Sequence, residues 1–245
     1  SNETTIITQA LINMRSLFLK KIKSGYSLDL DDNNDNIFPM AVHKYNKFSN
    51  KLIFPCHIQP KLDGHRVIAK LVNNEVILLT RRLHPIYGFA NIKEEILPIL
   101  KNNPGMILDG EFYVHSINLQ QISSIVRDEN IDNEDKLKIK YYVFDYINLA
   151  ENFTFEDRIE KLEIIFSNNI FNYLVLTPTF KINNEKEGND LYELFIKDGY
   201  EGAVYKSARA LYEASNIKEI RSYNYLKRKK AYDEEFEIAG FTCGI

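Results

Sequence analysis

The sequence has only two cysteines, Cys56 and Cys243, and they lie far apart without the spacing of metal ligands. Both are therefore expected to be reduced structural thiols in an intracellular protein. No apolar run approaches the length of a membrane span, and no signal-peptide pattern opens the chain. The sequence therefore gives no reason to expect a membrane partner.

A strong charge of either sign is also lacking, because 31 Lys and Arg against 34 Asp and Glu leave a net charge of −3 over 245 residues. Any contact with nucleic acid must then come from a local basic surface rather than from the field of the whole molecule. The candidates are Arg81-Arg82 and the KRKK run at 227–230, and either could equally be a solvated face. With 44% hydrophobic residues, the composition is that of a globular protein with ample material for a core.

The most informative segment that is present is KLDGHR at 61–66. A lysine amine can attack the α-phosphorus of a nucleotide and hold the nucleoside monophosphate as a phosphoramide, which splits one difficult transfer into two easier ones. Gly64 lets the backbone turn tightly or approach a ligand, and Arg66 can donate several hydrogen bonds to nucleotide oxygens. The alternative is the end of a surface strand with ordinary charges, so the motif alone is suggestive.

Four more short motifs follow in order: DGE at 109–111, VFD at 143–145, EGAVYK at 201–206 and KRK at 227–229. Read as K-x-D-G-x-R, D-G-E, F-D, E-G-x-V-x-K and K-x-K, the set resembles the ordered motifs of ATP-dependent DNA ligases. More broadly it resembles the covalent nucleotidyltransferases, which include RNA ligases and mRNA capping enzymes. The resemblance spans about residues 39–240. It implies an α+β nucleotidyltransferase (ATP-grasp-like) fold, with antiparallel sheets flanked by helices and the nucleotide bound between them.

Hydrophobic periodicity places elements along the chain. We expect strands at 56–59, 67–72, 76–80, 106–114, 141–146, 175–177, 203–206, 225–229 and 234–241. Helices are expected at 5–22, 91–100, 117–126, 155–166 and 186–197. Asn73-Asn74 is a hairpin signal between two of the strands. Helices and strands mix without a strict βαβ rhythm, which favours an α+β architecture over a doubly wound sheet.

The chain divides into two parts on this interpretation. Residues 1–37 form an N-terminal helix and an acidic, Asn-rich linker at 28–36, and residues 38–245 form the nucleotidyltransferase (adenylation) domain. DNA ligases carry an OB-fold domain after this region, and we expect that domain to be absent from this chain. We therefore expect the isolated chain to adenylylate itself slowly and to seal nicks poorly.

The resemblance assigns the nucleophile and the residues around the base and sugar. Lys61 would be the catalytic nucleophile. Gln59, two residues earlier, would face the adenine, since an amide can pair with N6 and N1, although it does not exclude other bases. Arg66 and Glu111 would bracket the ribose. Phe144 would stack on the purine, worth about 1–3 kcal/mol, where the alternative is an ordinary core aromatic.

The remaining assignments concern phosphates and metal. Arg81, in a Thr-Arg element, would hold a sugar or phosphate group. Glu201 would contact Mg²⁺, which usually takes only one or two protein carboxylates. Lys206, Lys227 and Lys229 would supply positive charge for the α-phosphate and the pyrophosphate. Because side chains alternate along a strand, Lys227 and Lys229 point to the same face.

The leading hypothesis is an ATP-dependent DNA ligase, with ATP and Mg²⁺ as cofactors and nicked duplex DNA as partner. Lys61 would take AMP from ATP, the AMP would pass to a 5′-phosphate, and a 3′-hydroxyl would displace it in replication or repair. An RNA ligase and an mRNA capping guanylyltransferase are the alternatives. A non-catalytic nucleotide or nucleic-acid binding module is an alternative of another class, which has no need for Lys61, Glu201, Lys227 and Lys229 together.

Overall fold

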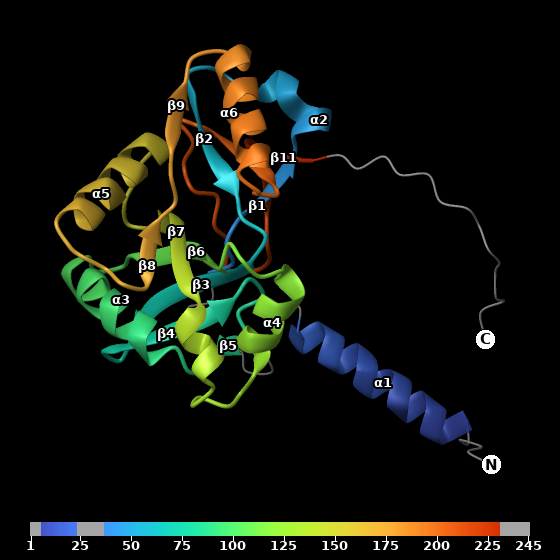
Figure 1. The fold of residues 1–245 in the computed structure, drawn as a ribbon. Helices are drawn as coiled ribbons and strands as arrows, with labels where there is room; N and C mark the ends of the chain where they lie inside the picture. Colours follow the sequence, from blue (N-terminus) through green and yellow to red (C-terminus); the bar gives the residue numbers. More distant parts are fainter. Residues whose placement is uncertain (1–5, 24–36, 231–245) are drawn as a thin grey trace.

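Two β-sheets face each other in the structure, a computed structural model that describes residues 6–23 and 37–230 (Figure 1). The five-stranded sheet has the order β1 (Ala41–Lys44), β11 (Arg221–Lys229), β10 (Gly202–Ser207), β2 (Cys56–Lys61) and β9 (Phe180–Ile182). The six-stranded sheet has the order β5 (Pro85–Ile86), β4 (Glu75–Thr80), β3 (His65–Val72), β6 (Ile107–Tyr113), β7 (Lys140–Ile147) and β8 (Leu174–Leu176). The predicted linker at 28–36, the predicted strand at 234–241 and Cys243 lie outside the described residues, and the domain division at residue 37 stays a prediction.

Both sheets are mixed, so the prediction of antiparallel sheets is wrong, although the α+β class is confirmed. β1 pairs with β11 in parallel, and β7 pairs with β8 in parallel. The chain passes from β7 to β8 through α5 (Phe155–Ser167), and such a crossover is what a parallel connection requires. β1 and β11 come from opposite ends of the domain, so no local pattern indicates their pairing.

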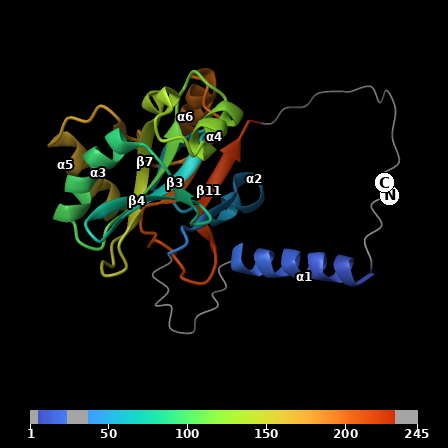
Figure 2. The ribbon, with the colours of Figure 1, turned by 90° about the horizontal axis from the view of Figure 1, so that it is seen from below.

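The helices cover the sheets from outside. α3 (Ala90–Asn102), α4 (Leu119–Arg127) and α5 pack on the six-stranded sheet, whereas α2 (Tyr45–Phe48) and α6 (Glu185–Lys197) pack on the five-stranded sheet. Two short 3₁₀ helices lie at Ser49–Lys51 and Glu134–Lys138. α1 (Ile6–Lys23) lies apart from both sheets in Figures 1 and 2. Within the described residues, no helix is long and apolar enough to cross a bilayer.

Local sequence signals explain several element boundaries. The hairpin between β3 and β4 turns at Asn73 and Asn74, which have φ of 50° and 65°, a left-handed conformation that asparagine tolerates. Capping boxes begin two of the helices: Asn118 with Gln121 at α4, and Thr154 with Asp157 at α5. Cys56, predicted to be a structural thiol, is free and fully buried in β2.

A buried ion pair connects elements of both sheets. Arg158 of α5 holds Asp145 of β7 with Nε–Oδ1 and Nη2–Oδ2 distances of 2.7 and 3.2 Å. Tyr225 of β11 donates its hydroxyl proton to Asp145 Oδ2 at 2.8 Å and accepts from Arg158 Nη2 at 2.7 Å. Burial alone would raise the pKa of Asp145, but the Arg158 guanidinium beside it lowers that pKa overall. The two sheets are therefore joined at this point by a fully paired polar contact.

The first prediction concerns this pair. Arg158→Met should lower the free energy of unfolding by about 3–5 kcal/mol, because it leaves the buried Asp145 carboxylate without its main partner. Urea unfolding at pH 7, followed by circular dichroism, measures the loss. The matched control is Lys181→Met, whose ion-pair partner Glu156 also lies in α5 but where both side chains are about half exposed. That control should cost less than about 1 kcal/mol. Equal losses in the two variants would contradict the proposed role of the buried pair.

Candidate active site between the two sheets

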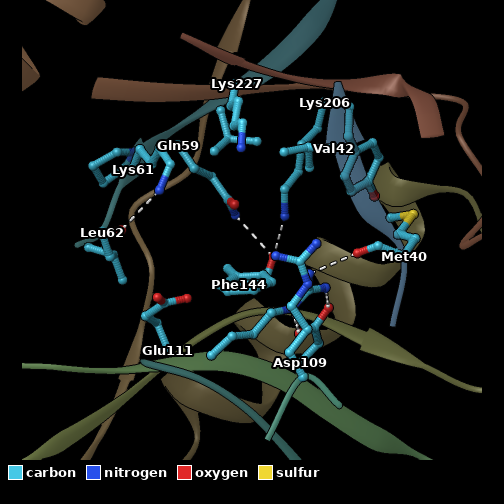
Figure 3. A pocket seen from close by; sticks show the side chains of 15 residues that line it. Met40, Val42, Gln59, Lys61, Leu62, Asp109, Glu111, Phe144, Lys206 and Lys227 are labelled. Carbon is cyan, nitrogen blue, oxygen red and sulfur yellow. Dashed lines mark hydrogen bonds and ion pairs between the residues drawn. The ribbon is translucent and has the colours of Figure 1, made fainter. Parts of the chain in front are cut away.

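A cavity opens between the two sheets and is lined from β1, β2, β3, β6, β7, β10 and β11 (Figure 3). Eight of the ten predicted site residues line it: Gln59, Lys61, Arg66, Arg81, Glu111, Phe144, Lys206 and Lys227. The other two, Glu201 and Lys229, are connected to it through Lys61. Residues that lie up to 168 positions apart in the sequence, from Gln59 to Lys227, thus share one cavity.

Strand register determines which side chains meet. β10 lies antiparallel between β2 and β11, and Gly202 is the partner of both Lys61 and Lys229. Two residues on, Val204 is the partner of both Gln59 and Lys227. Gly202 has φ of 154°, and a Cβ there would lie 2.0 Å from the Arg228 carbonyl oxygen, so the close strand approach requires glycine.

Lys61 and Lys229 share one carboxylate. The Lys61 ammonium pairs with Glu201 Oε2, and Lys229 pairs with Glu201 Oε1. Lys61 Nζ also donates to the Leu62 carbonyl oxygen at 3.3 Å. Burial would raise the pKa of Glu201, but Lys61 and Lys229 lower it overall, so this carboxylate is ionised at neutral pH. The amine end of Lys61 is thereby held at the edge of the cavity.

Gly64 allows the loop after Lys61 to lie against β6. A Cβ at this position would come within 2.3 Å of the Phe112 carbonyl oxygen and 2.8 Å of Glu111 Cγ. Any side chain would therefore push the loop away from the strand that carries Glu111.

Arg66 is held rigidly on the six-stranded sheet. Its Nε and Nη2 donate to the two oxygens of Asp109 at 2.9 and 2.7 Å, and its Nη1 donates to the Met40 carbonyl oxygen at 2.8 Å. Burial alone would lower the pKa of Arg66, but Asp109 raises it overall. Opposite Arg66 on β6, Glu111 faces the same cavity, and desolvation raises its pKa to about 7 despite Lys61 and Arg66.

Phe144 projects from β7 into the cavity, whereas a core aromatic would be packed among apolar side chains (Figure 3). Its carbonyl oxygen accepts from Lys206 Nζ at 2.8 Å and from Gln59 Nε2 at 3.2 Å. Burial lowers the pKa of Lys206 to about 8, against the opposing influence of Asp145 and Asp109. The Lys206 ammonium lies over the Phe144 ring, 4.9 Å from its centroid.

Arg81 stands at the mouth of the cavity and is about half exposed. Its Nη2 donates to Glu219 Oε1 at 2.6 Å. Arg81 also lines a neighbouring cleft with Arg82 and Arg127, which carries the carboxylates of Glu111, Asp128 and Glu129 as well. A local basic surface at Arg81-Arg82 therefore stays a prediction.

Residues 39–229 match the family described as ATP dependent DNA ligase domain. The chain belongs to this family. The resemblance drawn from the motifs is thus confirmed for most of the chain, which is a ligase adenylation domain.

Individual relatives agree with this assignment. The DNA ligase of African swine fever virus (isolate Warthog/Namibia/Wart80/1980) is 27% identical over 255 residues, which covers 99% of this chain and 58% of the viral protein. The DNA ligase of phage T4 is 24% identical and covers 76% of this chain and 47% of its own length. This ligase domain therefore spans about half of the curated relatives it matches.

Solved structures share the fold. The DNA ligase-adenylate of Chlorella virus superposes with a TM-score of 0.60 at 22% identity, covering 78% of this chain and 68% of that one. The ligase of bacteriophage T7 in complex with ATP gives a TM-score of 0.57 at 16% identity, with the same coverages. At these identities the likeness concerns the α+β fold.

Sequence reasoning missed several residues that hold the site of this ligase domain together. Asp109 and Tyr212 bind Arg66, whereas Arg158 and Tyr225 bind Asp145. Of these four, Asp109 and Tyr225 also line the cavity. Asp109 and Asp145 belong to the recognised motifs, and an aspartate inside a buried apolar strand is itself a signal of a paired charge. Tyr212 lies in a segment between strands and carries no such signal.

No group of three or more potential metal ligands of the His, Cys, Asp and Glu types occurs in residues 6–23 and 37–230. Mg²⁺ commonly takes one or two carboxylates and fills its remaining positions with water and substrate phosphates. Glu201, an ionised carboxylate beside the cavity, offers the hard oxygen donors that this ion requires, and its role as a metal contact stays a prediction.

The second prediction follows from Glu111. In the unfolded chain this carboxyl releases its proton near pH 4.5, whereas in the fold it holds the proton to about pH 7. Between these values the folded state binds more protons, so Glu111 makes the free energy of unfolding fall as pH rises from 4.5 to 7. Glu111→Gln should remove this decline. The free energy of unfolding of the variant minus that of the unsubstituted chain should therefore rise between pH 4.5 and 7 and stay constant above about pH 8.

Urea unfolding at half-unit steps between pH 4.5 and 8 measures the difference. Replacement of the exposed Glu94 by glutamine controls for the loss of one carboxyl. Parallel stability curves for Glu111→Gln and the unsubstituted chain would contradict the raised pKa.

Proposed function

We propose that Lys61 Nζ attacks the α-phosphorus of ATP, forms a phosphoramide with AMP and releases pyrophosphate. The observation that carries this proposal is the position of the Lys61 amine at the edge of the cavity between the sheets, where Glu201 holds it and further cations surround it. A nucleophilic lysine must lose its proton before attack. Glu201, which accepts from both Lys61 and Lys229, positions that amine, and its lowered pKa makes it a weak acceptor of the proton, which passes to solvent.

Positive charge around Lys61 prepares the cavity for a polyphosphate. Desolvation lowers the pKa of Lys227, and the ammonium groups of Lys61 and Lys229 lower it further. This mutual repulsion is relieved when an anion enters. We assign Lys206, Lys227 and Lys229 to the α-phosphate and the pyrophosphate leaving group, where fixed cations stabilise the charge that develops during transfer.

The base and the sugar would lie between the two sheets. Phe144 and Val204 both line the cavity, from β7 and β10, and we propose that the purine stacks on the Phe144 ring. Gln59 would read the base edge. Arg66 and Glu111 would hold the ribose, Glu111 because its carboxyl accepts or donates near neutral pH. Arg81, at the mouth, would bind a sugar or phosphate oxygen.

Glu201 is the residue that would hold Mg²⁺. When bound, the ion would offset phosphate charge during nucleotidyl transfer. Because Glu201 also pairs with Lys61, metal binding and release of the lysine amine would be linked at this one carboxylate.

For the whole protein we propose ATP-dependent sealing of nicks in duplex DNA, with an OB-fold domain completing the reaction. The family match and the DNA ligases of African swine fever virus and phage T4 support this. RNA ligation differs from this function in the polymer that is sealed, and mRNA capping differs in the nucleotide, GTP, that is used. A binding module that lost the chemistry would have no use for the Lys61, Glu201 and Lys229 contact.

The third prediction tests the nucleophile. Incubation with α-labelled ATP and Mg²⁺ should label the protein covalently, and Lys61→Ala should take up no label because the attacking amine is removed. The matched control is Lys101→Ala, an exposed lysine on α3, which should label as the unsubstituted chain does. Labelling of Lys61→Ala would identify another nucleophile, and label from GTP in preference to ATP would favour a capping enzyme.

The fourth prediction concerns the polymer. A full-length protein that contains this chain should seal a nick in duplex DNA faster than the same nick in duplex RNA. Parallel gel assays with both substrates measure the two rates. Faster sealing of RNA, with the protein labelled from ATP, would favour the RNA ligase alternative.

A further inference from the structure

The amide of Gln59 is oriented by groups behind the cavity. Gln59 is almost fully buried on β2, and its Nε2 donates to Thr179 Oγ1 at 2.8 Å and to the Phe144 carbonyl oxygen at 3.2 Å. An amide nitrogen carries two protons, so both are used within the protein. Within the part of the chain that the structure describes, Gln59 Oε1 has no such partner, and Gln59 lines the cavity.

The partners of the Gln59 amide determine which of its two end atoms, Nε2 or Oε1, lies on which side. A carbonyl oxygen only accepts hydrogen bonds, so the atom of Gln59 that faces the Phe144 carbonyl must be the nitrogen. Thr179 adds a second constraint, because its hydroxyl donates its one proton to the Thr177 carbonyl oxygen at 3.0 Å. Towards Gln59 it can then only accept.

The Thr177 carbonyl is itself held in place. Thr177 is buried, and its backbone N–H donates to the Val143 carbonyl oxygen of β7 at 2.8 Å. The same β7 carries Phe144, whose carbonyl oxygen also accepts from Lys206 Nζ at 2.8 Å. A chain of hydrogen bonds thus runs from β7 through Thr177 and Thr179 to Gln59.

We propose that Thr179 is a positioning residue that makes Gln59 present only an acceptor to the base, and that it thereby selects a 6-amino purine over a 6-oxo purine. The inference rests on the proposed function, since it assumes that a purine nucleotide occupies the cavity. The 6-amino group of adenine donates to Gln59 Oε1. The 6-oxo group of guanine or hypoxanthine would face it oxygen to oxygen, with the opposing Gln59 protons engaged elsewhere.

Without the Thr179 hydroxyl, one of the two contacts that resist rotation of the amide is lost. The Gln59 Nε2 proton that Thr179 had engaged is then free to donate to a 6-oxo group, while the other proton stays on the Phe144 carbonyl oxygen. Selectivity between the two classes of base should fall by about tenfold, the scale of one hydrogen bond.

The test compares ATP with inosine triphosphate, which carries a 6-oxo group without the 2-amino group of guanine. Dissociation constants are measured by isothermal titration calorimetry without Mg²⁺, so that no covalent step intervenes. The unsubstituted chain should prefer ATP by about tenfold or more. Thr179→Val should lose about tenfold of the preference. Thr179→Ser, which keeps the hydroxyl, should retain it within about twofold.

Thr177→Val is the matched control. The Thr177 hydroxyl is buried with no hydrogen-bond partner among the described residues, and the chain of hydrogen bonds uses only the backbone of Thr177. This variant should therefore keep the preference for ATP. Thr179→Val with an unchanged preference, or a loss in Thr177→Val equal to that in Thr179→Val, would overturn the inference.

A measurement without any substitution keeps the proposal testable if Thr179→Val fails to fold. Purine riboside triphosphate, which has no group at C6, should bind the unsubstituted chain more weakly than ATP and more tightly than inosine triphosphate. Equal affinity for the three nucleotides would overturn the role of Gln59 and Thr179 while leaving nucleotide binding intact. A chain that binds none of them would instead overturn the proposed function.

Discussion

Antiparallel pairing of β10 with both β2 and β11 is the constraint on which the side of the cavity that carries Gln59, Lys61 and Lys227 depends. Gly202 is the partner of Lys61 and Lys229, and Val204 is the partner of Gln59 and Lys227. Because side chains alternate along strands, a register slip of one residue would turn every one of these groups to the opposite face. The apolar residues that alternate with them, Ile58 and Leu226 among them, are fully buried in the core beneath α6. Burial of that other face therefore stabilises the register that assembles the site.

A second constraint lies between the sheets, where two carboxylates face each other. Asp109 and Asp145 are partners on the adjacent strands β6 and β7, and both are about 1% exposed. Two buried like charges in that position would repel unless each had its own cation. Arg66 and Arg158 supply these cations with two contacts each, and Tyr212 and Tyr225 complete the pairs as hydroxyl donors to Asp109 and Asp145.

These two paired groups leave Lys206 as an additional buried cation. Burial lowers its pKa to about 8, although Asp145, which lies 3.9 Å away and is also bound by Arg158, acts in the opposite direction. A charge that is poorly compensated in the protein is well suited to a phosphate that arrives from outside. The chain as a whole is slightly acidic, so the positive character of this cavity is a local property built by the fold.

Local signals in the sequence predicted most strands and helices, and long-range pairings explain the failures. The Asn73-Asn74 hairpin was predicted because its turn and its two strands are contiguous. β1, β5 and β9 were missed: each has only two to four residues, too few to show an alternating pattern, and β1 pairs with a strand about 180 positions away. β8 is as short, but its apolar run was recognised. The site residues were named from the motifs, and the fold brings them to one cavity. The residues that hold these side chains in place were not named from the sequence. Arg158, Tyr212 and Thr179 act through contacts that only the folded chain creates.

The two ends of the cavity along β2 carry different chemical groups. Gln59 and Lys61 are two residues apart on one face of the strand, roughly 6–7 Å in an extended chain. An amide that presents an acceptor therefore lies at one end and an amine at the other, with Phe144 facing the space beside them. A nucleotide bound along this strand would meet Gln59 with its base and Lys61 with its α-phosphate. Recognition of the base and placement of the reacting phosphorus would then depend on a single rigid strand, so a nucleotide misaligned at the Gln59 end would also be displaced from the nucleophile.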